Sequence, residues 1–405
     1  MIENKVINNI KSNEEGANHY QLKDVGDGTI TSGNHTPYWF ESMIQPIAFA
    51  PLIEDIETDI VVIGGGIAGL TTAYCLAAQG YKVTLIEDGF IGSGETGRTT
   101  AHLTCVLDAR YVDLEKTFDL NTARLVAQSH NAAIDWIENI IKTNNIECHF
   151  MRVDGFLFSH ETDSNENLQD EYKATQRIGL NTQMLNKIPA IHSDQVKWCI
   201  KFSNQAQLHM MLYLKGLTDA FNLLGGKIFT ETRAEKVSKE GVIANGFNIK
   251  AKHVVVATNS PINDWVTMHT KQWPYRSYVI ATKITKGKLP NALWWDTGDQ
   301  NSKWVSKPYH YIRTDSFDDN YDVLIAGGED HRTGQANNEN ILEPNRYDNL
   351  IAWTRKQFPD MGEIIYKWSG QVLEPIDGLA YIGKNPGDDN IYIITGQSGN
   401  GITYI

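Results

Sequence analysis

Three consecutive glycines, Gly64 to Gly66, stand between a short β-branched run and a longer apolar run that ends at Gly80. A short, continuous run of β-branched residues predicts a buried strand, and the run after the glycines predicts a helix. The segment YKVTLIE at residues 81–87 predicts a second strand. Together these segments form a β-α-β unit of about 30 residues, which requires a parallel sheet and a right-handed crossover.

The glycines of this turn match the pattern G-x-G-x-x-G at Gly64, Gly66 and Gly69. In that pattern the first glycine makes the tight turn, the second admits a pyrophosphate, and the third packs the helix on the strand. The helix N-terminus offers N–H groups and a positive dipole end to phosphates. Glu87, at the end of the second strand, is placed to accept hydrogen bonds from a ribose diol. A structural glycine turn beside an incidental glutamate fits this context less well, so a dinucleotide site is predicted, for FAD or NAD.

Length and charge restrict the remaining possibilities. A chain of 405 residues is too long for one compact core, so two domains are expected. The net charge of −13 argues against nucleic acid and anionic membranes as main partners, and no apolar run approaches the roughly 20 residues of a membrane span. The four cysteines show no C-x-x-C spacing and suggest no disulfide framework, which favours a reducing cytoplasm.

The order of predicted elements indicates an α/β fold in which a Rossmann-like, parallel-sheet domain is interrupted by an antiparallel α+β substrate domain. A polar arm precedes this body, and the aromatic segment TPYWFESM at residues 36–43 is expected to dock on it. The expected division is an arm at 1–56, a cofactor domain at 57–150, 205–265 and 365–405, and a substrate domain at 151–204 and 266–364.

The segment FIGSGETGRTTAHLT at residues 90–104, together with DIVVIGGGIAGL and VTLIED, resembles the D-amino-acid-oxidase-like FAD-dependent oxidoreductases. The motifs YWFES, YHYIR, GGEDHRTGQ, WSGQ and TGQSGNG further resemble a bacterial branch of that family that carries a C-terminal Rieske domain. The likeness runs from about Tyr38 to the end of the chain.

This resemblance implies that FAD is the cofactor. Arg98, Thr99 and Thr100 would contact its pyrophosphate, although a solvated surface charge is the alternative for Arg98. His102 would lie near the flavin ring, with a covalent bond as one hypothesis and a hydrogen-bonded loop histidine as the better supported one. The family's adenine contact and its last flavin segment fall on four further residues: Val237, Gly396, Gly399 and Gly401.

The implied chemistry is hydride transfer to flavin N5 from a C–H next to an amine of a small-molecule substrate. Candidate residues of the substrate wall are Tyr309, Tyr311, Arg313 and His331, among which Arg313 could hold a carboxylate in a bidentate contact. Ordinary aromatic packing in a sheet is the alternative for this set. The electron acceptor is unknown, so both a dehydrogenase and an oxidase stay open.

The end of the chain departs from the family pattern. The chain stops at Ile405, just past the last glycine turn, where the family continues into a long helix. The C-x-H and C-x-x-H pairs of a Rieske cluster are absent, and no metal site is predicted. A truncated, non-catalytic remnant that binds flavin weakly or not at all is therefore the second hypothesis.

Overall fold

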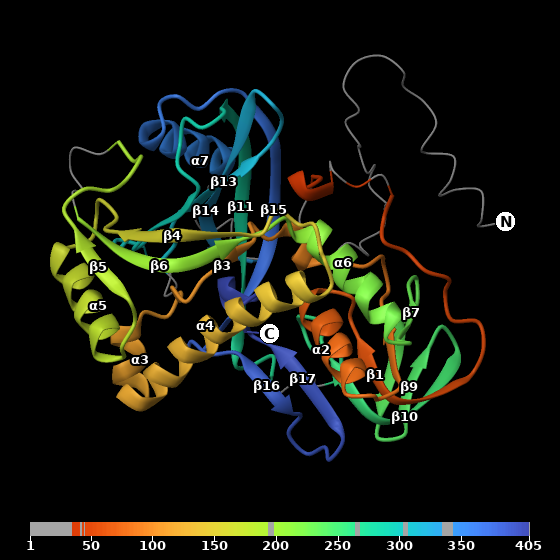
Figure 1. Ribbon diagram of the computed structural model, residues 1–405. Coiled ribbons are helices and arrows are strands. Elements are labelled where there is room, and N and C mark those ends of the chain that lie inside the picture. The colour runs from red at the N-terminus through yellow and green to blue at the C-terminus, as the bar shows by residue number, and fades with distance from the viewer. Residues whose placement is uncertain are drawn as a thin grey trace.

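The computed structural model describes residues 35–40, 43, 45–192, 198–263, 268–302, 307–333 and 343–404. Residues 1–34 of the arm predicted at 1–56 lie outside this described part. Two large sheets organise the molecule, and Figure 1 shows them as two bodies that share the long helix α4 (Leu120–Thr143) between them.

The first sheet is built around β1 (Ile56–Ile63), which is parallel to β10 (Phe247–Val256) on one side and to β2 (Val83–Ile86) on the other. Its main path runs β16-β17-β10-β1-β2-β7. β17 (Ile391–Thr395) and β7 (Lys227–Phe229) are also parallel to their neighbours, whereas β16 (Tyr381–Lys384) is antiparallel. The parallel sheet predicted from the glycine turn is therefore confirmed.

A hairpin leads into the central strand β10. β9 (Gly241–Ala244) pairs with β10 in an antiparallel manner across a turn at Asn245 and Gly246, whose φ angles are 49° and 80°. Both residues tolerate this left-handed region, and Asn-Gly is the pair that most favours a two-residue hairpin turn. β8 (Ala234–Ser238) extends the hairpin on the other side of β9.

Two helices cover one face of the first sheet. α2 (Ile67–Ala78) follows the glycine turn, and α6 (Met210–Leu223) packs against it, as Figure 1 shows. Leu70, Leu85, Leu214 and Leu217 are fully buried in the core between these layers. At about 25 cal/mol per Å² of apolar surface, such burial is the main source of stability for this body.

The second sheet has nine strands in the order β15-β11-β14-β13-β12-β4-β6-β3, with β5 beside β6. Most pairs are antiparallel, but β12 and β4 are parallel. The bounds are β3 (His102–Leu103), β4 (Met151–Phe158), β5 (Thr182–Leu185), β6 (Cys199–Gln207), β11 (Gln272–Thr285), β12 (Ala292–Asp296), β13 (Tyr311–Ser316), β14 (Tyr321–Arg332) and β15 (Ile364–Pro375). This antiparallel sheet agrees with the predicted fold class.

Three parts of the expected domain division differ from the structure. Residues 102–103 and 205–207 were assigned to the cofactor domain, but they lie in β3 and β6 of the second sheet. Residues 365–375 were also assigned to the cofactor domain, but they form β15, which pairs with β11 along its whole length in the second sheet. A strand belongs to the sheet that satisfies its main-chain hydrogen bonds. The cofactor side of the C-terminal region therefore begins after β15.

Helices pack beside the second sheet in two groups, α7 in one and α3, α4 and α5 in the other. α7 (Glu343–Gln357) packs on β11 and β14, while α3 (Tyr111–Thr117) packs against α4 and α5 (Asn165–Arg177). Three short 3₁₀ turns complete the described elements: η1 (Tyr38–Phe40), η2 (Glu95–Arg98) and η4 (Ser398–Asn400).

The aromatic segment before β1 docks on the body, as predicted. Trp39 is fully buried and Tyr38 is 7% exposed. The indole Nε1 of Trp39 donates to the carbonyl oxygen of Thr99 at 2.5 Å. This segment is thus part of the folded core.

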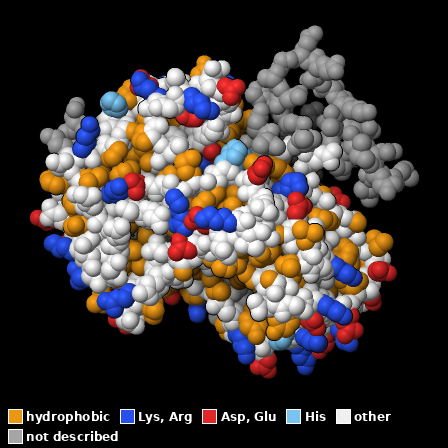
Figure 2. Space-filling model, viewed as in Figure 1, with side chains coloured by type: hydrophobic (Ala, Val, Ile, Leu, Met, Phe, Trp, Pro, Cys, Tyr) orange, Lys and Arg blue, Asp and Glu red, His pale blue; other side chains and the backbone are white. Residues whose placement is uncertain are grey.

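The surface carries both charge signs. On the face shown in Figure 2, basic and acidic side chains are intermixed over both bodies. Within the described residues, every helix is too short or too polar to cross a membrane.

Candidate functional site

The turn between β1 and α2 brings main chain closely together. Gly64 has φ of +110°, and a Cβ there would lie 2.4 Å from the carbonyl oxygen of Ala257. A Cβ on Gly69 would lie 1.9 Å from the carbonyl oxygen of Gly64. Only glycine satisfies these two positions, so the structure explains both of them by close main-chain packing.

The N-terminus of α2 lies beside η2, whose Arg98 is expected to contact the pyrophosphate. Gly66 is the N-cap and supplies no side-chain cap. The hydroxyl Oγ1 of Thr96 accepts from the N–H of Ile67 at 3.0 Å and would lie 2.8 Å from a Cβ on Gly66. Thr96 was not among the expected residues. The tight strand-to-helix turn, the helix N-terminus and the adjacent hydroxyl fit the diphosphate of a dinucleotide.

Glu87 follows the last residue of β2 and is tied to the glycine turn. Its Oε2 accepts from the N–H of Gly65 at 2.6 Å, and its Oε1 accepts from the N–H of Gly89 at 2.9 Å and from Ser93 Oγ at 3.3 Å. Burial raises the pKa of Glu87 to about 7. A carboxylate has about four lone-pair sites, so acceptor capacity for a ribose diol remains.

The loop carrying Arg98 is fixed to β15. Arg98 donates through Nη1 to the carbonyl oxygen of Ser369 at 2.9 Å, and the indole of Trp368 donates to the carbonyl oxygen of Arg98 at 2.8 Å. Glu95 accepts from the N–H of Gln371 at 2.7 Å, and burial raises the pKa of Glu95 to about 7. Arg98 is half-buried, and its bond to Ser369 holds the guanidinium in position. This environment differs from that of a solvated surface charge.

His102 has both ring nitrogens engaged within the protein. Nε2 lies 3.2 Å from the carbonyl oxygen of Ile312, which can only accept, so Nε2 carries the proton. Nδ1 lies 2.9 Å from Thr100 Oγ1 and accepts from it. Burial, and then the charge of Arg313, lowers the pKa of His102 to about 3. The imidazole is therefore neutral. Thr99 Oγ1, the neighbouring hydroxyl, accepts from the N–H of Ala101 at 3.1 Å.

Aromatic rings continue from His102 along the sheet. The ring centroids of Trp295 and Tyr311 lie 5.5 and 5.9 Å from that of His102, and Tyr309 lies 5.6 Å from Tyr311. The hydroxyl of Tyr311 is 2.5 Å from Ser277 Oγ. Two of the predicted wall residues, Tyr309 and Tyr311, thus lie on the same face as His102.

A group of carboxylates stands beside Tyr309, and it was not foreseen from the sequence. We call Asp108, Asp330 and Glu374 the acidic cluster. Asp108 accepts from the hydroxyl of Tyr309, and its Oδ2 accepts from Ser398 Oγ at 2.5 Å and from the N–H of Gly399 at 2.8 Å. Ser398 Oγ also lies 2.8 Å from Glu374 Oε1. Because the single hydroxyl proton of Ser398 goes to Asp108, a protonated Glu374 is the donor in this second contact. The cluster therefore joins Tyr309 to the last glycine segment.

Burial favours the neutral forms of two carboxyl groups in the acidic cluster. Burial, together with the charge of Asp108, raises the pKa of Glu374 to about 8, and burial raises the pKa of Asp330 to about 7. A cation placed among these groups would favour their ionised forms. The arrangement is therefore suited to a positively charged ligand.

The expectation that Arg313 holds a substrate carboxylate was wrong. Its side chain is fully buried, and Nη1 faces three main-chain carbonyl oxygens, those of Thr100, Ala101 and Leu208, at 2.8–3.2 Å. Nη2 donates to Asp315 Oδ2 at 2.8 Å. The guanidinium is therefore hydrogen-bonded within the protein, and it anchors the loop that leads to His102.

His331 lies on the other face of the sheet. Its ring stacks on Tyr278 at 5.8 Å, and Tyr278 in turn contacts Tyr347 of α7. Ser277, the residue before Tyr278, contacts Tyr311 on the opposite face. Since neighbouring residues of a strand alternate, His331 is separated from the tyrosines by the sheet itself.

The remaining predicted cofactor residues lie in two regions, the last glycine segment and strand β8. Gly396 has φ of +69°, and a Cβ on Gly399 would lie 2.7 Å from Asp108 Oδ2. Gly401 follows η4 and has room for a Cβ, whose nearest neighbour would be 3.8 Å away. Val237 is half-buried in β8. A role of these four residues in holding a cofactor stays a prediction.

The sequence is similar to those of known proteins. The family model described as "FAD dependent oxidoreductase" (DAO) matches residues 59–405. The "Putative Rieske 2Fe-2S iron-sulfur protein YhfW" of Bacillus subtilis is 30% identical over 372 residues, covering 90% of this chain and 70% of that protein. The "Gamma-glutamylputrescine oxidoreductase" of Escherichia coli is 25% identical over 382 residues, covering 91% and 86% of the two chains.

Solved structures agree on the fold. Glycine oxidase from Geobacillus kaustophilus superposes with a TM-score of 0.69 at 17% identity, covering 86% of this chain and 91% of that one. L-proline dehydrogenase from P. horikoshii superposes with a TM-score of 0.67 at 18% identity, covering 86% and 90%. At these identities the likeness supports the arrangement of the two sheets.

Proposed function

This chain belongs to the DAO family of FAD-dependent oxidoreductases, and we propose that it oxidises a small-molecule amine at a C–H bond next to nitrogen. FAD is the cofactor, and when bound it supplies the hydride acceptor, flavin N5. The observation that carries the proposal is the pairing of the glycine turn of the first sheet with an aromatic and acidic wall on the second sheet.

The cofactor role rests on the turn between β1 and α2. We assign the diphosphate to Gly64, Gly66, Gly69 and the N-terminus of α2, and the ribose diol to Glu87. The half-buried Arg98 supplies positive charge close to this turn, since η2 also carries the Thr96 that bonds to Ile67. The remaining proposed contacts are Thr99, Thr100, His102, Val237, Gly396, Gly399 and Gly401.

The substrate class follows from the charges of the wall. With Arg313 engaged by the fold, no other predicted wall residue offers a guanidinium to a carboxylate. The acidic cluster and the hydroxyl of Tyr309 instead favour a cationic amino group. We therefore propose an amine with a second positive charge, such as a di- or polyamine, in preference to a simple amino acid. The similarity to gamma-glutamylputrescine oxidoreductase supports an amine substrate.

The residues of the wall would act by orientation. A carboxylate hydrogen-bonded to Tyr309 would fix the distal ammonium, so that the carbon next to the reacting nitrogen faces the flavin. Tyr311 and Trp295, packed on His102, would exclude water from that face. The neutral state of His102 avoids a positive charge that would oppose cation binding.

An anaerobic titration tests this function. The purified protein should show the visible bands of bound FAD, and polyamines should bleach them at lower concentrations than glycine or N-methyl amino acids do. Faster bleaching by simple amino acids would overturn the proposed substrate class. A colourless protein that does not take up added FAD would overturn the enzyme itself and favour the non-catalytic remnant, which the match over residues 59–405 does not favour.

A further inference from the structure

The ends of three adjacent strands bring two histidines and an aspartate together in the second sheet. β4 and β12 are parallel, so their carboxyl ends share one edge, and antiparallel β13 begins at that same edge. His160 follows β4, Asp296 ends β12, and His310 immediately precedes β13. One ligand atom from each side chain lies within 4.8 Å of the other two.

We propose that His160, Asp296 and His310 bind a divalent transition-metal ion, with Zn²⁺ the ion best suited to two imidazoles and one carboxylate. The three residues do not form a short metal-binding motif in the sequence, so the sequence did not predict this site. The site is separate from the proposed amine site, because His310 stacks on Trp353 of α7 whereas Tyr309 bonds to Asp108.

Hydrogen bonds fix the orientation of the Asp296 carboxylate, as is usual for a carboxylate that binds a metal ion. Its Oδ1 accepts from the N–H of Gly298 and of His310, each at 3.0 Å, and its Oδ2 lies 2.8 Å from Nδ1 of His310. Two ligand atoms at about 2.0–2.1 Å from a tetrahedral ion lie roughly 3.3 Å apart. The ion can therefore replace the proton shared by Asp296 and His310 after a small opening of this pair.

His310 has a partner for its other nitrogen and a fixed ring plane. Its ring stacks on Trp353 with centroids 3.9 Å apart and planes 11° from parallel. Its Nε2 lies 3.4 Å from Glu329 Oε1. Metal-bound histidines commonly donate their second N–H to a carboxylate, which orients the ring and increases its basicity. Glu329 is placed for that role.

The hydrogen bonds of His160 leave its outer nitrogen for the ion. Thr162 Oγ1 donates to Asp299 Oδ1 at 2.9 Å, since a carboxylate can only accept. That hydroxyl therefore accepts from Nδ1–H of His160 at 2.8 Å, and the lone pair falls on Nε2. The N–H of Thr162 also lies 3.2 Å from Nδ1, which would favour the other tautomer, but this contact is the longer one.

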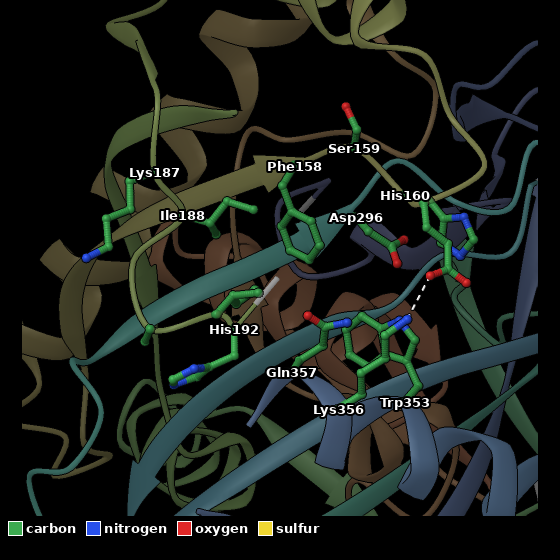
Figure 3. Close-up of a pocket in the computed structure, with 13 residues that line it drawn as sticks. Phe158, Ser159, His160, Lys187, Ile188, His192, Asp296, Trp353, Lys356 and Gln357 are labelled. Atoms are coloured by element: carbon green, nitrogen blue, oxygen red, sulfur yellow. Dashed lines mark hydrogen bonds and ion pairs between the residues drawn. The ribbon is translucent and has the colours of Figure 1, made fainter. Parts of the chain in front are cut away.

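A cavity gives the ion access. His160 and Asp296 line a cavity of about 690 Å³, and Figure 3 shows them beside each other, with Trp353 of α7 nearby. Three protein ligands beside an open volume leave a fourth position for water, as in zinc sites that are not closed. The rival interpretation is an ordinary Asp296–His310 ion pair that binds nothing.

Equilibrium dialysis separates the two interpretations. FAD-loaded protein without an affinity tag is treated with EDTA, dialysed against Zn²⁺ and subjected to elemental analysis. We expect one Zn²⁺ per chain, and Co²⁺ in its place should give the intense visible bands of a tetrahedral ion. Failure of the wild-type protein to retain Zn²⁺ would overturn the proposal.

Variants locate the ion. His160→Ala should weaken Zn²⁺ binding by at least about tenfold, and Thr162→Val should weaken it by a smaller factor through the loss of the orienting hydroxyl. His192→Ala is the matched control, because His192 lines the same cavity without belonging to the three. Bound FAD and the thermal midpoint report folding for each variant. Equal Zn²⁺ affinities for His160→Ala and His192→Ala would also overturn the assignment.

Discussion

The hydroxyl of Tyr309 donates a hydrogen bond to Asp108, a residue 201 positions earlier in the chain. Asp108 also binds the hydroxyl of Ser398 and the N–H of Gly399. Three segments from different parts of the sequence thus meet at one carboxylate. This junction connects the second sheet to the last glycine segment, and the first prediction concerns it.

Asp108→Asn should raise the KM for a diamine by about tenfold while kcat changes less, because a carboxylate contributes more to cation binding than an amide does. The amide oxygen of the substituted side chain can still accept from Tyr309, but the amide nitrogen cannot accept from the N–H of Gly399 as Oδ2 does, so bound FAD and the thermal midpoint are used to check the fold of the variant. Steady-state kinetics on FAD-loaded protein provide the measurement. Asp113→Asn, at an exposed position of α3 that pairs with Lys116, is the control. An unchanged KM in the Asp108 variant would contradict the proposed amine contact.

Gly66→Val should reduce FAD affinity by about tenfold or more, equivalent to about 1.4 kcal/mol or more of binding free energy. The added Cβ would lie 2.8 Å from Thr96 Oγ1, at the N-terminus of α2 where we place the diphosphate. Fluorescence titration of the flavin-free protein measures the affinity. Ala78→Val, at the exposed end of the same helix, should bind FAD as the wild type does. Equal affinities for the two variants would place the diphosphate elsewhere.

Denaturation should release all of the flavin. Both ring nitrogens of His102 are hydrogen-bonded within the protein, to Thr100 and to the carbonyl of Ile312, so we expect no covalent link. The measurement is flavin absorbance in the supernatant and pellet after acid precipitation. A yellow pellet would support the covalent hypothesis, and His102→Asn would then have to abolish the colour of the pellet.

Glu374→Gln should stabilise the protein at pH 8 and leave its stability nearly unchanged at pH 5. Burial raises the pKa of Glu374 from 4.5 to about 8, so the folded state keeps a proton that the unfolded chain releases within this window. The unfolding free energy of the wild type therefore falls as pH rises from 4.5 to 8. Glutamine stays neutral and avoids that loss, which we put at about 1–2 kcal/mol after allowing for solvent screening.

Urea unfolding at the two pH values measures this difference for Glu374→Gln. Glu235→Gln, at an exposed position of β8, should show no such pH dependence relative to the wild type. If the Glu374 variant were less stable than the wild type at pH 8, the direction of the pKa shift would be wrong.

Arg313→Lys should destabilise the fold by about 3 kcal/mol or more, because a buried, fully hydrogen-bonded charge would lose several partners at once. Lysine has three donors and cannot reproduce the contacts with three carbonyl oxygens and Asp315. Arg177→Lys is the control, since Arg177 pairs with Glu115 at an exposed position and should cost less than about 1 kcal/mol. Chemical unfolding gives both values. Similar losses for the two variants would contradict the structural role of Arg313.

Local patterns predicted the parts of this molecule that depend on local geometry. The turn at Gly64 is fixed by the positive φ angle that glycine adopts there, and the strand and the helix predicted on its two sides are both present. The burial of Trp39 was also predicted, because a large aromatic in a polar segment needs a surface to cover it.

Features that depend on distant pairing were not predicted. The sheet to which residues 365–375 belong is decided by hydrogen bonds to β11, which lies far earlier in the chain. Arg313 was expected at a substrate because its type suits a carboxylate, yet its neighbours come from the loop at Thr100 and from Leu208. Thr96 and the acidic cluster were missed for the same reason, since their partners become adjacent only after folding.

The burial of Trp39 determines where the autonomous folding unit starts. The family match begins at residue 59, but the indole already bonds to Thr99 and lies within the same core as α6. A shortened protein trimmed to the family boundary would leave a hole the size of an indole beside the loop that holds Arg98. Anyone designing a minimal version for crystallisation should therefore retain the chain from residue 35 onward.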